Sequence, residues 1–170
     1  MHLDTYLTEG RLHGLLQEFC VSRGYATPIA QPPVPGTRMR FDFEIHTPSG
    51  NSYVEFDGDS HYRDATVMYR DSLKQAFADS SGFRLVRVPY FVQLDSTVFE
   101  HYFLEPFDIS TSFPHGFHTT KVLPASFCGL GLKRFYAELE ALPRGVREAV
   151  WASLEAKALS LPSPFVFPQA

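Results

Sequence analysis

The sequence predicts an α/β fold in which a mixed central sheet of about four strands is flanked by helices. Between residues 39 and 88, short segments alternate apolar and polar side chains, which is the period of a strand. Before, between and after them, apolar residues recur every three or four positions, which is the period of a helix. With 170 residues and 44% hydrophobic content the chain is long enough to bury one core. We therefore expect a compact domain, with a core over residues 1–104 and an irregular and helical extension over residues 105–170 packed on it.

The first expected element is a helix over residues 5–23, because apolar side chains between Leu12 and Phe19 fall on one helical face. Thr8 is of a type that suits its first turn. Residues 26–37 follow and hold four of the 13 prolines, which predicts an ordered loop.

Two strands are expected next, over residues 39–45 and 52–57, because both segments alternate cleanly. The segment Pro48-Ser49-Gly50-Asn51 between them is typical of a hairpin turn. In the first strand, the alternation predicts that Phe41 and Phe43 share the apolar face.

A second helix is expected over residues 65–80, with Leu73, Ala76 and Phe77 facing inward and an end near Gly82. The apolar residues 83–88 predict a third long strand. Because a helix connects this strand to the hairpin, it can lie parallel to its neighbour.

The rest of the chain is expected to be helical or irregular. A short helix is indicated over residues 94–104, followed by an irregular stretch to residue 130. Two further helices are predicted over residues 132–142 and 143–159, with a break at Pro143. These helices and the proline-rich tail offer a surface for a homodimer or a protein partner.

Three carboxylates of the hairpin should lie on one face of the sheet: Asp42, Glu55 and Asp57. Mg²⁺ prefers hard oxygen ligands and usually takes only a few carboxylates, keeping other positions for water and substrate phosphate. A bound Mg²⁺ activates a water and neutralises charge on a phosphate. The spacing therefore predicts a metal site formed by these three acids.

In the order of its motifs, the segment RFDF…VEFDG..HY…RD..K…LVRVPY over residues 40–90 resembles the PD-(D/E)XK nuclease superfamily. Within it, the segment is similar to the branch of the very-short-patch-repair endonucleases and certain phage homing endonucleases, which carries a Glu-x-Asp…His…Asp variant of the site. The resemblance implies a restriction-endonuclease-like core, DNA as substrate and Mg²⁺ as cofactor, with Mn²⁺ as a substitute. It extends over about residues 5–92 and leaves residues 105–170 uncovered.

The resemblance implies roles for individual residues. Asp42 and Glu55 would be metal ligands, and Asp57 would be a third acid near the metal, at the place of the usual lysine. His61 would act as a general acid/base, or would position the attacking water or the leaving group. Lys74 would supply the positive charge of the missing lysine.

Two more acids are candidate site residues, namely Asp71 on the second helix and Glu9 on the first. The basic residues expected to contact phosphate are Arg38, Arg40, Arg63 and Arg70.

Ordinary structural explanations exist for several of these residues. Asp71 and Lys74 are separated by one helical turn and suit a surface ion pair. Arg84 and Arg87, on an otherwise apolar strand, suit structural ion pairs.

The function expected from these residues is metal-dependent endonuclease activity on DNA. One alternative is a catalytically inactive nuclease fold that serves as a binding or assembly module, because the usual lysine is replaced. Another is an accessory protein of a phage or mobile element that acts through a protein partner, with its aromatic tail over residues 160–170 making the contact.

Net charge and cysteine content narrow the class of protein. A net charge of −4 argues against a broad basic surface but not against a metal-dependent nuclease, whose acids are neutralised by the cation. Two cysteines are too few for a disulfide framework, which favours a reducing compartment. No apolar run reaches about 18 residues and no secretory signal is evident, so we expect a cytoplasmic protein without a membrane segment.

Overall fold

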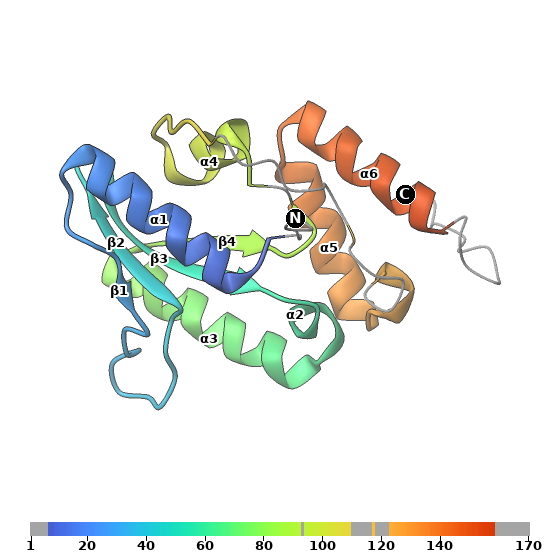
Figure 1. Cartoon of the computed structure of the whole chain (residues 1–170). Helices are drawn as coiled ribbons and strands as arrows, with labels where there is room; N and C mark the ends of the chain where they lie inside the picture. Colours follow the sequence, from blue (N-terminus) through green and yellow to red (C-terminus); the bar gives the residue numbers. More distant parts are fainter. Residues whose placement is uncertain (1–6, 93, 110–116, 118–122, 159–170) are drawn as a thin grey trace.

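The computed structural model describes residues 7–92, 94–109, 117 and 123–158, and it confirms the predicted α/β class (Figure 1). A four-stranded mixed sheet has the order β1-β2-β3-β4. The strands are β1 (Ile29–Ala30), β2 (Phe43–Thr47), β3 (Gly50–Asp57) and β4 (Arg84–Pro89). Strand β2 is antiparallel to both β1 and β3. Strands β3 and β4 are parallel, as the helical connection between them predicts.

Helices surround this sheet. They are α1 (Glu9–Arg23), α2 (Ser60–Arg63), α3 (Ala65–Ser81), α4 (Ser96–Phe103), α5 (Gly129–Ala141) and α6 (Arg144–Ala158). The predicted break at Pro143 separates α5 from α6, and the predicted stop at Gly82 is confirmed by its left-handed backbone, with φ of 74°. The two-residue β1 and the short α2 lie in segments where no element was predicted. In the described part of the chain, no helix is both long and apolar enough to cross a membrane.

Helix α1 begins later than predicted. The backbone of Thr8 is extended, and its side chain accepts a hydrogen bond from the backbone N–H of Arg11 at 3.3 Å. Thr8 is therefore the N-terminal cap and not part of the first turn, so the helix starts at Glu9 rather than at residue 5.

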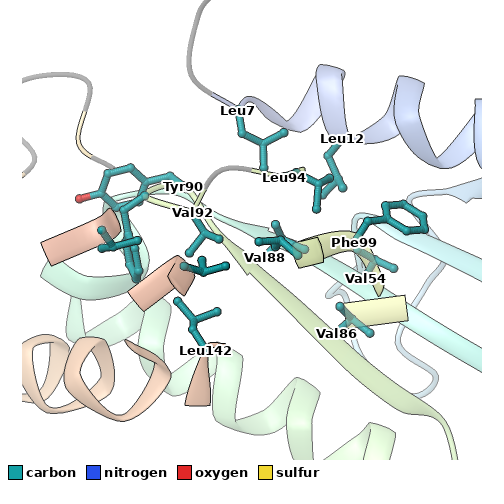
Figure 2. Packing of buried hydrophobic residues seen from close by; sticks show 14 of the residues in the cluster. Leu7, Leu12, Val54, Val86, Val88, Tyr90, Val92, Leu94, Phe99 and Leu142 are labelled. Carbon is teal, nitrogen blue, oxygen red and sulfur yellow. The ribbon is translucent and has the colours of Figure 1, made fainter. Parts of the chain in front are cut away.

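One face of the sheet is covered by α1 and α4, and the larger apolar cluster on this side continues into α5 and α6. Figure 2 shows Leu7 and Leu12 lying over side chains of β3 and β4, among them Val54, Val86 and Val88. Glu55 and Arg87 alternate with these valines along β3 and β4, so their side chains lie on the opposite face of the sheet.

The backbone bends at Asp42, and this bend overturns one prediction. Strand β2 starts only at Phe43, whose partner across the ladder is Val54 of the larger cluster. Phe41 instead stacks on Tyr53 with ring centroids 4.0 Å apart, in a smaller apolar cluster on the opposite face. The predicted common face of Phe41 and Phe43 is therefore wrong.

Helix α3 covers that opposite face, and it does so with polar residues as well as apolar ones. Phe77 packs on the smaller cluster, but Leu73 is 40% exposed and Ala76 is also exposed, so their predicted inward placement is wrong. The buried residues of the helix are Asp71 and Ala78. The helix is turned this way because the strands beneath it present charged side chains, which Asp71 can pair with.

A close helix contact holds the C-terminal part of the chain on the core. Helix α5 packs directly on α2 (Figure 1). A Cβ atom on Gly131 would lie 1.6 Å from the carbonyl oxygen of Tyr62, so only glycine fits there. The same carbonyl accepts a hydrogen bond from the backbone N–H of Cys128 at 3.2 Å.

Substitution of Gly131 by alanine tests this contact. Gly131→Ala is expected to lower the free energy of unfolding by about 2 kcal/mol or more, because the backbone of Tyr62 cannot move aside as a flexible side chain could. Urea denaturation measures the effect. The matched control is Gly129→Ala at the start of the same helix, where no atom lies within 4 Å of the added Cβ. Equal stability of the two variants would contradict the contact.

Candidate functional site

A buried ionic network lies between the sheet and helices α2, α3 and α5. Asp57, at the end of β3, has no exposed surface. Its Oδ1 atom pairs with Nη1 of Arg87 on β4 at 2.8 Å, and its Oδ2 atom accepts a hydrogen bond from Nη2 of Arg134 on α5. Both oxygens of this carboxylate are therefore paired with arginines from distant parts of the chain.

Asp71 of α3 joins the same two arginines. Its Oδ2 atom lies 2.6 Å from Nη1 of Arg134, and its Oδ1 atom lies 3.4 Å from Nη1 of Arg87. Burial raises the pKa of Asp71, but the hydrogen bond from His61 and the charge of Arg87 outweigh burial and lower the pKa to about 2. Two aspartates and two arginines thus balance in charge, and this balance is what allows them to be buried.

His61 of α2 is held by both aspartates. Its Nδ1 atom lies 2.7 Å from Oδ2 of Asp71 and 3.2 Å from Oδ1 of Asp57. Burial lowers the pKa of His61, but the hydrogen bond to Asp71 and the charge of Asp57 outweigh burial and raise it. A carboxylate on Nδ1 fixes the orientation of an imidazole and leaves Nε2 for proton transfer.

A second pair of charges lies beside this network. Glu55 of β3 is 1% exposed, and both of its carboxylate oxygens lie 2.8 Å from Nζ of Lys74 on α3. Burial raises the pKa of Glu55 to about 7; Lys74 opposes this rise, whereas the charge of Asp42 adds to it. The effect of burial on this carboxyl group thus outweighs the opposing charge of Lys74.

Asp42 lies at the bend before β2. One of its oxygens, Oδ2, accepts a hydrogen bond from the backbone N–H of Phe56 at 2.7 Å. Its charge raises the pKa of Glu55, and together with burial it raises the pKa of Glu9 on α1. The acids Glu9, Asp42 and Glu55 thus influence one another, while Asp57 is paired within the separate network.

A cavity of about 480 Å³ opens beside His61, and half of its lining residues are arginine or lysine. Its lining residues are Arg38, Met39, Arg40, His61, Val67, Arg70, Asp71 and Lys74. Of the four arginines predicted to contact phosphate, three therefore meet at one place. Arg63 does not line the cavity, and its Nη1 atom pairs with Oδ2 of Asp59 at 2.7 Å on the surface.

Arg134 is the site residue that sequence reasoning missed. Its guanidinium contacts Asp57 and Asp71, donates to Oε1 of Glu138 at 2.7 Å, and lies 5.0 Å from the ring centre of Tyr62. In the sequence it is one of many surface-type cations on a helix. The only local signal is the glycine three residues before it, which permits a close helix approach.

The two groups of acids differ in how they suit a metal ion. Asp57, His61 and Asp71 offer one ligand atom each within 4.8 Å of one another. All four carboxylate oxygens are nevertheless engaged by arginine or histidine, so this group does not fit a cation in the observed arrangement. Asp42 and Glu55 fit better, because their oxygens are hard ligands and, of the paired cations, only Lys74 has to withdraw from Glu55.

Comparison with known proteins returns no match to a protein-family model, to a curated protein or to a solved structure. The nuclease resemblance therefore rests on the residues described above and remains an expectation.

Removal of Arg134 tests the ionic network. Arg134→Met is expected to lower the free energy of unfolding by about 3–5 kcal/mol, because Asp57 and Asp71 would keep buried charges with one partner fewer. The control is Arg144→Met, since Arg144 forms the same type of pair with a glutamate four residues on but is 84% exposed. That control should change stability by less than about 0.5 kcal/mol. Similar losses in the two variants would show that the network does not stabilise the fold.

Proposed function

We propose that this chain is a metal-dependent endonuclease that hydrolyses phosphodiester bonds of DNA, and that the scissile phosphate binds in the cavity beside His61. The observation that supports this proposal is the juxtaposition of four cationic side chains with a carboxylate-oriented imidazole in one cavity of about 480 Å³. That volume suits a nucleotide-sized group. Guanidinium groups pair with phosphate oxygens through two parallel hydrogen bonds, which positions the reacting group.

His61 is the proposed general acid/base. Asp71 and Asp57 hold its Nδ1 side, so the ring is aligned toward the cavity and Nε2 can donate or accept a proton there. The raised pKa of His61 keeps a larger share of the imidazole protonated near neutral pH, which favours donation of a proton to the leaving oxygen.

Asp42 and Glu55 are the proposed ligands of Mg²⁺, with Mn²⁺ as a substitute. The bound cation supplies an activated water and neutralises charge on the phosphate. Lys74, when it leaves Glu55, remains on the cavity wall, where its ammonium group can pair with a phosphate oxygen. The same lysine would thereby keep Glu55 compensated in the absence of metal and contact substrate in its presence.

A second candidate function is binding of a DNA backbone without cleavage. The specific observation that favours it is that Lys74, Arg87 and Arg134 already neutralise the acids of the site. The cationic cavity would then bind phosphate alone. Contact of a protein partner through residues 160–170 also stays a prediction, because these residues lie outside the described part of the chain.

The rate of DNA cleavage by the His61→Asn variant distinguishes the endonuclease function from binding without cleavage. An asparagine amide can still donate to Asp71 but cannot transfer a proton, so cleavage should fall by about 10²–10⁴-fold. Rates are measured on supercoiled plasmid and on duplex, nicked, mismatched and single-stranded oligonucleotides, with Mg²⁺, Mn²⁺ or EDTA.

The control for this variant is His46→Asn, since His46 is also a histidine hydrogen-bonded to a carboxylate, at 2.6 Å, but lies on the exposed side of β2. Its rate should equal that of the unmodified chain. If the unmodified chain shows no metal-dependent cleavage of any substrate, the endonuclease proposal fails and the binding function remains.

Binding of DNA by Arg70→Gln tests the cavity itself. Measured by fluorescence anisotropy in EDTA, the affinity should fall several-fold, and the slope of its logarithm against the logarithm of salt concentration should shrink by about one. Arg63→Gln is the control, because Arg63 is also an exposed arginine near α3 but does not line the cavity. Equal effects of the two substitutions would contradict the proposed place of phosphate binding under either function.

A further inference from the structure

A second, smaller cavity lies at the other end of the strands, near the β2–β3 turn and the end of α4. Its volume is about 190 Å³, and its wall is mostly polar, with Asn51, Ser52 and Arg84 among its lining residues. The glycines Gly50 and Gly82 also line it, so backbone there is not covered by a side chain. This cavity shares no lining residue with the one beside His61.

The strand register separates Arg84 from the ionic network. Arg84 is directly paired with Ser52 across the parallel strands, so their side chains leave the same face of the sheet. Arg87 lies three positions further along β4 and therefore points to the opposite face, toward Asp57. Two arginines of one strand thus serve different faces.

Arg84 lacks the ion pair that its position predicts. Arg87 forms the expected pairs with Asp57 and Asp71, but no described carboxylate pairs with Arg84, although its side chain is half-buried. Burial lowers the pKa of Arg84, and no negative charge offsets this effect. Burial also lowers the pKa of His101, and the positive charge of Arg84 lowers it further. Arg84 therefore brings to the cavity a positive charge with which no described carboxylate is paired, although Glu105 accepts a hydrogen bond from Ser49 on the same wall.

The hydrogen-bonding groups of the wall divide into engaged and available ones. The hydroxyl of Thr47 donates to the carbonyl oxygen of Gly50, and that of Ser49 donates to Glu105. Ser52 is 6% exposed, and its hydroxyl makes no hydrogen bond within the described residues. Asn51 precedes it on β3, so its side chain leaves the opposite face of the sheet. The cavity thus presents a guanidinium from Arg84 and a hydroxyl from Ser52 on the same face of the sheet, and both can donate.

We propose that this cavity binds a small oxyanion of the phosphate class, held by Arg84 together with Ser52. A half-buried cation without a partner is costly, and an anion would remove that cost. A guanidinium matches the oxygens of phosphate with two parallel hydrogen bonds. A volume of about 190 Å³ is below the usual range for pockets of drug-sized ligands, so free phosphate or a terminal phosphate group fits, but a whole nucleotide does not. The proposal does not depend on nuclease activity.

Backbone amide NMR of the full ¹⁵N-labelled chain tests the site. Inorganic phosphate and glycerol 3-phosphate are titrated separately, with sodium chloride as the ionic control. The amide signals of Gly50, Ser52 and Gly82 should shift and saturate with a Kd near or below about 1 mM. Equal affinity for the two probes identifies free phosphate as the occupant, whereas about tenfold tighter binding of the ester identifies an organic phosphate.

Substitutions of Arg84 test whether the shifts of the amide signals arise from phosphate bound to this residue. Arg84→Met should weaken binding by about tenfold or more, and Arg84→Lys should weaken it less, because the charge remains. Arg70→Gln, in the other cavity, should leave these three signals and their Kd unchanged. Unsaturable shifts in the unmodified chain, shifts that sodium chloride reproduces, or an unchanged Kd in Arg84→Met would each overturn the proposal. The first two outcomes do not depend on whether any variant folds.

Discussion

Compensation of the charge on Asp57 is the constraint on which the rest of this structure depends. The carboxylate stands at the end of a central strand with no access to water, where an unpaired charge would cost several kcal/mol. One partner, Arg87, comes from the neighbouring parallel strand, and the other, Arg134, comes from a helix far along the chain. For Arg134 to reach it, α5 has to lie directly on α2, and Gly131 makes that approach sterically feasible. The pairing of β3 with β4, the contact of α5 with α2 and the glycine at position 131 all bring arginines to one buried acid, Asp57.

The acids of the site differ in how firmly their cationic partners hold them. Asp57 and Asp71 are held by two planar guanidinium groups, which remain charged at any pH that a protein experiences and match carboxylates with several hydrogen bonds. Glu55 is held by a single flexible lysine, and the pKa of Glu55 stays near 7 despite it. An arriving cation would therefore displace Lys74 far more readily than either arginine. Asp42 and Glu55 are therefore the acids proposed for a metal, whereas both oxygens of Asp57 are paired with arginines in the observed arrangement.

The hydrophobic periodicity of the sequence correctly predicted those features that depend on residues close to one another along the chain. The alternation of residues 52–57 placed Glu55 and Asp57 on one face, and Gly82 ended its helix as expected, because both depend on neighbours in sequence. The errors came where tertiary contacts override the local pattern. A bend at Asp42 sends Phe41 to Tyr53, and α3 buries Asp71 in place of Leu73 because charged strands lie beneath it. The role of Arg134 was out of reach for the same reason, since nothing near it in sequence specifies a partner 77 positions away.

The shared use of Asp71 and Asp57 links the C-terminal part of the chain to the chemistry of the core. These two carboxylates hold Arg134 and also orient His61 through its Nδ1 atom, and Oδ2 of Asp71 contacts both partners. Arg134 also donates to the backbone carbonyl of His61 at 3.2 Å. Any shift of α5 would therefore change both the charge around His61 and the position of its backbone. The expected resemblance to nucleases leaves residues 105–170 uncovered. His61, the proposed proton-transfer group, is nevertheless contacted both by Asp71 within the covered segment and by Arg134 beyond it. Helix α5 is thus part of the candidate site, and a chain truncated at residue 104 would lack one of the cations that keep its acids buried.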